Sequence, residues 1–138
     1  MAKSIKLNIT PDFNFILLGL VTSEPIYRVA WLINELLNIQ LKETEELIQF
    51  YNKKKTITQN FIKYSYLTEN EHYYHLFQNK GGQGVLIEEY KNIDYWIAIE
   101  DLSVDFNKVM EGIKQLNNIS LVFKIDPSTL KSKNKLFF

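Results

Sequence analysis

The apolar run from Phe13 to Val21 constrains the fold of this chain more than any other segment. It begins by alternating around Asn14 and then becomes apolar on both faces. Because successive side chains of a strand point to opposite faces, such a run predicts a central strand covered on both sides of its sheet. Residues 4–10 alternate between apolar and polar side chains just before it, and we expect them to form a hairpin with residues 13–21.

Helical and strand patterns follow along the rest of the chain. Apolar residues recur at helical spacing from Ile26 to Leu37, after a helix-start cluster at 22–25, and again from Phe106 to Leu116. Alternating or short apolar segments predict strands at 47–51, 61–67, 72–78, 85–88, 95–100 and 119–125. Residues 1–138 are therefore predicted to form a single α+β domain, with an antiparallel or mixed sheet of about six to eight strands and two main helices packed on it.

Two expectations concern side-chain burial. Trp31 and Leu32 widen the apolar surface of the first helix, which predicts burial on more than one side. In the last strand, the odd-numbered residues from 119 to 125 are all apolar, and this strict alternation gives the strand one apolar face.

Composition and charge exclude several classes of protein. Sixteen basic and sixteen acidic side chains cancel, which argues against a protein that coats nucleic acid and against a basic membrane-surface protein. The chain has no cysteine, so disulfides, thiolate metal sites and a cysteine nucleophile are excluded. The N-terminus shows no signal-peptide core, and the longest apolar run is far too short to cross a bilayer. We expect a cytoplasmic protein without membrane contact, cofactor or metal.

Residues 87–95, with the sequence Ile-Glu-Glu-Tyr-Lys-Asn-Ile-Asp-Tyr, resemble the signature of the IPExxxVDY family of small bacterial proteins. Glu88 stands where the family has proline, and Ile93 stands where it has valine. Further blocks that match the family pattern in order are 12–15, 17–19, Tyr27-Arg28 with Trp31 and Asn34, Asn79-Lys80, 125–126 and 131–133. The resemblance covers most of the chain and implies a single-domain cytoplasmic protein, but the family has no assigned reaction, cofactor or catalytic residues.

The signature contributes to one candidate site, which consists of Arg28, Glu89, Asp94 and Tyr95. Arg28 is the only arginine, and its guanidinium can bind a carboxylate through two parallel hydrogen bonds. We favour a structural interpretation, in which Arg28 pairs with Glu89 or Asp94 and ties the first helix to the signature loop. The alternative is a small anionic-ligand binder or an enzyme at this loop. No partner base or further ligand is recognisable, so we predict no catalytic residue and no metal site there.

Four tyrosines on two neighbouring strands form the second candidate, an aromatic surface of Tyr64, Tyr66, Tyr73 and Tyr74. With the nearby lysines, such a surface could stack on the bases of single-stranded RNA, and it would equally suit a protein partner. Cross-strand packing is the interpretation we favour.

Histidines and aromatic residues complete the functional prediction. His72 and His75 lie three apart on a predicted strand and therefore point to opposite faces, so they are expected to be a surface and a half-buried histidine rather than a metal pair. We predict a non-enzymatic binding or adaptor domain that acts through contacts with a protein partner. An RNA-associated accessory protein is the alternative, and homodimerisation is a further one.

Overall fold

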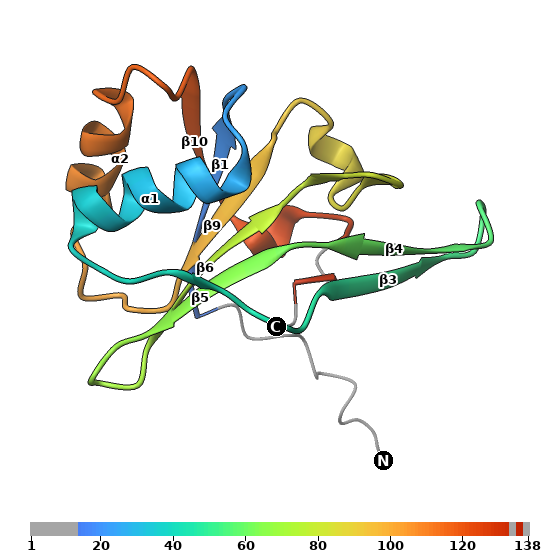
Figure 1. The fold of residues 1–138 in the computed structure, drawn as a ribbon, viewed down its shortest axis with the longest axis horizontal. Coiled ribbons are helices and arrows are strands. Elements are labelled where there is room, and N and C mark those ends of the chain that lie inside the picture. The colour runs from blue at the N-terminus through green and yellow to red at the C-terminus, as the bar shows by residue number, and fades with distance from the viewer. Residues whose placement is uncertain (1–13, 133–134, 137–138) are drawn as a thin grey trace, which may run out of the picture.

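A six-stranded antiparallel sheet forms the centre of the computed structural model, which describes residues 14–132, 135 and 136 (Figure 1). The strands follow the order β10-β1-β9-β6-β5-β2, and every neighbouring pair is antiparallel. In chain order they are β1 (Ile16–Val21), β2 (Lys42–Glu43), β5 (Lys63–Leu67), β6 (Tyr73–Gln78), β9 (Tyr95–Ile99) and β10 (Leu121–Ile125). Two separate ribbons pair β3 (Ile48–Asn52) with β4 (Ile57–Phe61) and β7 (Lys80–Gly81) with β8 (Gly84–Val85).

Two helices, α1 (Ile26–Leu37) and α2 (Phe106–Lys114), pack on one face of this sheet (Figure 1). The carboxylate of Asp105 caps α2 by accepting from the backbone N–H groups of its first turn. Short 3₁₀ turns are η3 (Glu88–Tyr90) and η4 (Pro127–Thr129). The predicted α+β class is confirmed, and no helix in the described part of the chain is long and apolar enough to cross a membrane.

The strand β1 is covered on both faces, as its apolar run predicts. Its Leu18 and Leu20 belong to a first core between the sheet and the helices, whereas Leu17 belongs to a second core on the opposite face. β1 lies between β10 and β9 in the sheet. The predicted hairpin partner, residues 4–10, lies outside the described residues.

The second core forms around Trp96, which is fully buried on the face of the sheet opposite the helices. The base of the β3–β4 ribbon and the signature loop both contribute to it through buried side chains: Ile48, Phe61, Leu86, Ile87 and Ile93. The molecule therefore has three layers, with the helices, the sheet, and a layer of ribbon and loop.

The strand predictions differ from the structure at several segments. The predicted strand at 85–88 is wrong, because β8 ends at Val85 and a 3₁₀ turn begins at Glu88. The consecutive residues Leu86 and Ile87 are both fully buried, which an alternating strand does not allow. The strands β2, β4 and β7 were not predicted, although β4 begins with the β-branched residues Ile57 and Thr58.

The apolar alternation in β10 faces away from the helices. Leu121 is 53% exposed and Phe123 is 43% exposed, whereas Val122 is buried. Val122 pairs with Leu20 of β1 and shares its helix-facing side, while Phe123 pairs with Gly19, which offers no side chain to pack against. The odd-numbered residues of this edge strand therefore do not form a fully buried face.

Substituting Gly19 tests the closest approach in the second core. A Cβ at this position would lie 2.8 Å from Ile93 Cδ1 and 2.9 Å from Trp96 Cζ3. The indole of Trp96 is held by a hydrogen bond, so we expect Gly19→Ala to lower the free energy of unfolding by about 1–3 kcal/mol in urea denaturation. Gly82→Ala is the matched control, because nothing lies within 4 Å of its added Cβ. Equal losses in the two variants would contradict the close contact.

Candidate functional site

A single buried amide, that of Asn79 just after β6, fixes the course of the signature loop. Its Nδ2 donates to the carbonyl oxygens of Tyr90 and Ile93, each at 2.8 Å. Its Oδ1 accepts from Ile87 N at 2.9 Å and from Trp96 Nε1 at 2.8 Å. An asparagine side chain offers two donors and two acceptor positions, so all of its hydrogen-bonding capacity is used by the loop and by Trp96 of β9.

The two signature carboxylates bind other segments of the same chain. Glu89 accepts from Ser132 N at 2.9 Å and from Ser132 Oγ at 2.6 Å. Burial favours a higher pKa for Glu89, but the hydrogen bonds from Ser132 outweigh it and hold the pKa below its usual value. Asp94 accepts from Thr22 N at 2.9 Å, and Lys80 Nζ lies 3.1 Å from its other oxygen.

Tyr95 also acts as a tie within the chain. Its hydroxyl donates to the backbone oxygen of Glu24 at 2.7 Å. Burial, followed by the negative charges of Asp94 and Glu24, raises the pKa of this phenol. Asp94 and Tyr95 thus hold the connection between β1 and α1, at Thr22 and Glu24 respectively. In the described residues, the signature side chains of Glu89, Asp94 and Tyr95 are therefore bound to other segments of the same chain.

Arg28 does not reach these carboxylates. Its half-buried guanidinium lies 4.7 Å from the centroid of the Trp31 ring, one turn along α1. No carboxylate among the described residues forms a salt bridge with it. The favoured ion pair with Glu89 or Asp94 is therefore not formed, because Glu89 binds Ser132 and Asp94 binds Thr22 and Lys80. The four-residue cluster does not gather around one cavity.

The four tyrosines of the second candidate lie on opposite faces of the sheet. Tyr64, Tyr66 and Tyr74 face the helices and pack in or against the first core. Tyr73 lies on the other face, where its ring stacks on that of His75 with centroids 5.0 Å apart. The hypothesis that the four tyrosines share one surface is therefore wrong, because neighbouring positions in a strand alternate between faces.

His75 is buried rather than half-buried. Its Nδ1 lies 2.6 Å from Ser65 Oγ on the paired strand. Burial, with a smaller effect from the charge of Lys63, lowers the pKa of His75 to about 4, so the imidazole is neutral at pH 7. In the part of the chain that the structure describes, no three histidine, aspartate or glutamate side chains group closely enough to hold a metal ion.

The outward face of α1 carries two large exposed aromatic side chains. Tyr27 is 67% exposed and Trp31 is 51% exposed, and they lie four residues apart on neighbouring turns. Leu32 is buried as expected, but the expected burial of Trp31 is wrong. The helical rotation puts Trp31 on the side of α1 away from Val29 and Ile33, which face the first core.

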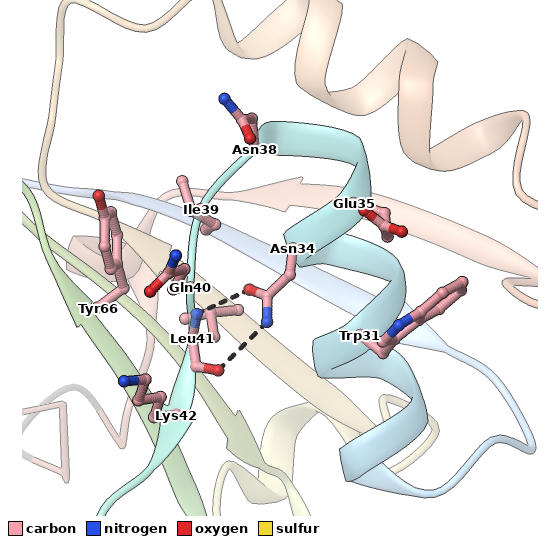
Figure 2. Close-up of a pocket in the computed structure, with 9 residues that line it drawn as sticks. All are labelled: Trp31, Asn34, Glu35, Asn38, Ile39, Gln40, Leu41, Lys42 and Tyr66. Carbon is pink, nitrogen blue, oxygen red and sulfur yellow. Dashed lines mark hydrogen bonds between the residues drawn. The ribbon is translucent and has the colours of Figure 1, made fainter.

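An open concavity of about 620 Å³ lies beside Trp31 (Figure 2). Residues of the second half of α1, the segment that follows it and β5 line this space: Trp31, Asn34, Glu35, Asn38, Ile39, Gln40, Leu41, Lys42 and Tyr66. The side chain of Asn34 accepts from Leu41 N at 2.7 Å and donates to Leu41 O at 3.2 Å. This pair of bonds fixes the wall of the concavity and satisfies backbone groups next to the edge strand β2.

Sequence reasoning missed this concavity, although one signal was present. Tyr27 and Trp31 stand at an i, i+4 spacing next to the only arginine, and this pattern is compatible with an outward aromatic face. The hydrogen bonds of the Asn34 side chain to Leu41 could not be predicted, because they correspond to no periodic pattern in the sequence. Comparison of the chain with protein-family models, curated proteins and solved structures found no match, so the resemblance to the IPExxxVDY family stays a prediction.

Removing the Asn79 amide should strongly destabilise the fold. Asn79→Ala leaves one buried and one partly buried carbonyl, one backbone N–H and the Trp96 indole N–H without their partner. We expect the free energy of unfolding to fall by about 3 kcal/mol or more, measured by urea denaturation. Asn92→Ala, at an exposed position in the same loop, should change it by less than about 0.5 kcal/mol. A similar small change for both variants would show that the loop does not depend on Asn79.

His75 predicts a loss of stability in mild acid. Its pKa is about 4 in the folded state and about 6.5 in an unfolded chain, so only the unfolded state takes up a proton between these values. Stability should therefore decrease as the pH falls from about 6.5 towards 4, by up to about 3 kcal/mol. Urea midpoints at several pH values measure this slope. It should persist in His72→Gln and flatten in His75→Gln; the same slope in both variants would refute the assignment.

Proposed function

We propose that this protein is a non-enzymatic binding domain that recognises a segment of a partner protein through the outward face of α1. The exposure of Trp31, beside the exposed Tyr27, carries the proposal. Tryptophan, tyrosine and arginine dominate the binding energy of protein interfaces, and all three types lie together here, with Arg28 against the Trp31 ring.

The concavity beside Trp31 favours a peptide segment as the ligand. Its walls combine apolar surface from Trp31, Leu41 and Tyr66 with the amide groups of Asn38 and Gln40. Apolar surface can hold a side chain of the segment, while exposed amides can pair with its backbone N–H and C=O groups. A volume of about 620 Å³ has the size of a typical ligand pocket.

The surface is held in place by contacts at both ends of α1. Before the helix, Asp94 binds Thr22 N and Tyr95 binds Glu24 O. Near its end, Asn34 binds Leu41. A preformed surface loses less conformational entropy on binding than a mobile one, which supports recognition by this face of the helix.

Trp31→Ala tests the proposal. A partner is captured from native extract on the full-length chain, purified, and titrated against both forms. We expect the variant to bind about thirtyfold more weakly, because truncation of a central aromatic anchor costs about 2 kcal/mol or more. Leu102→Ala removes another exposed apolar side chain, one that does not line the concavity, and should leave the affinity unchanged.

Tryptophan fluorescence supplies an independent measurement. The chain has two tryptophans, of which Trp31 is half exposed and Trp96 is fully buried. A soluble quencher should therefore reach mainly Trp31, and the bound partner should protect it. A partner that binds Trp31→Ala with full affinity, or that leaves the quenching of Trp31 unchanged, would contradict the proposed surface.

A further inference from the structure

The β3–β4 ribbon projects from the body of the molecule on the side away from the two helices (Figure 1). Five register pairs join its strands, from Ile48 opposite Phe61 at the base to Asn52 opposite Ile57 near the tip. The base is anchored, because Ile48 and Phe61 are buried in the second core. Gln59 adds a bond from its Nε2 to the carbonyl oxygen of Gln83 at 2.9 Å. These contacts attach the base of the ribbon to the rest of the molecule.

The tip of the ribbon presents three exposed lysines, Lys53, Lys54 and Lys55. The Oδ1 atom of Asn52 accepts from Lys54 N at 3.0 Å and from Lys55 N at 3.1 Å, which fixes the turn. Thr56 completes it in the left-handed conformation, with φ of 52°. Within the described residues, none of the three ammonium groups forms a salt bridge with a carboxylate. The ammonium of Lys55 lies beside Gly84 of β8, where an added Cβ would come within 3.2 Å of it, and all three charges lack a carboxylate partner among the described residues.

Charge is unevenly distributed along this neutral chain. Residues 47–68 contain four lysines and no aspartate or glutamate, although the whole chain has sixteen acidic side chains. Glu45 and Glu46 precede this stretch on the base side of the ribbon. Three of these four lysines lie at the tip of the ribbon, so a polyanion would meet a favourable potential there.

One face of the ribbon is suited to bases as well as phosphates. Its positions carry Gln49, Tyr51, Thr58 and Asn60, and the opposite face has the buried Ile48, Asn52, Gln59 and Phe61 near Phe50 and the exposed Ile57. Tyr51 is 53% exposed, and Gln49 Nε2 bonds Asn60 Oδ1 across the strands at 3.1 Å. An exposed ring flanked by amides and hydroxyls can stack on one base and bond its edge or the ribose.

We propose that the β3–β4 ribbon binds single-stranded RNA, with Lys53, Lys54 and Lys55 on the phosphates and Tyr51 stacked on a base. A single strand fits better than a duplex, because stacking on Tyr51 needs a base whose face is free. RNA fits better than DNA, because the amide and hydroxyl groups beside Tyr51 can bond the 2′-hydroxyl. This surface is separate from the outward face of α1 and does not depend on that proposal.

Fluorescence anisotropy of the full chain with a labelled single-stranded RNA of about 12 nucleotides tests the inference. Three phosphate contacts predict that log K falls with log salt concentration with a slope of about −2. Lys53→Gln, Lys54→Gln and Lys55→Gln combined should bring the slope close to zero. Tyr51→Ala should weaken binding by about tenfold or more while leaving the slope unchanged, because stacking releases no counterions.

A second triple variant separates local from overall charge. Lys108→Gln, Lys114→Gln and Lys124→Gln combined remove the same charge from α2 and β10, at the end of the molecule away from the ribbon (Figure 1). This variant should retain the slope, with folding of each variant checked by thermal unfolding. The inference is overturned by absence of binding at about 50 mM salt, by equal losses in the two triple variants, or by equal affinity for DNA of the same sequence or for duplex RNA.

Discussion

The buried amide of Asn79 is the interaction on which the rest of this structure most depends. Three of its four hydrogen bonds join the backbone of Ile87, Tyr90 and Ile93 to one side chain, and the fourth fixes the indole of Trp96. Each of these groups lies in the interior or at its margin, where a missing partner is costly. The second core packs around this loop, so the same amide joins the polar and apolar parts of that layer.

The signature loop in turn positions the helix that carries the proposed binding surface. Because Asn79 fixes the loop, Asp94 reaches Thr22 and Tyr95 reaches Glu24 at the start of the connection to α1. In the sequence, the carboxylates and the tyrosine of the signature lie close together and resemble a catalytic group. In the structure, their hydrogen bonds hold other segments of the chain in place. Recognition is proposed at Tyr27 and Trp31, which these ties orient.

Much of the fold could be predicted from local patterns, and two of the errors arise where distant segments of the chain meet. The apolar run of β1, the stripes of α1 and α2, and most strands follow periodicity, which depends on neighbours along the chain. The course of the chain at 85–88 and the missing ion pair of Arg28 depend on contacts between distant segments, whereas the outward position of Trp31 follows from the rotation of the helix. Asn79 contacts residues up to 17 positions away, and Glu89 bonds Ser132 across 43 positions. No periodic pattern records such contacts.

The net charge of the chain is a further property of the sequence that does not predict the local surface. The equal numbers of acidic and basic residues argue against nucleic-acid binding only if the charges are mixed evenly over the surface. In this chain a stretch without any acidic residue contains the projecting ribbon, and the turn of the ribbon carries three consecutive lysines. Screening confines the influence of distant carboxylates to about 10 Å at moderate salt, so charges elsewhere on the molecule act only weakly on a ligand at the tip. The local potential of the ribbon, rather than the net charge of the chain, therefore governs which ligand this end of the molecule attracts.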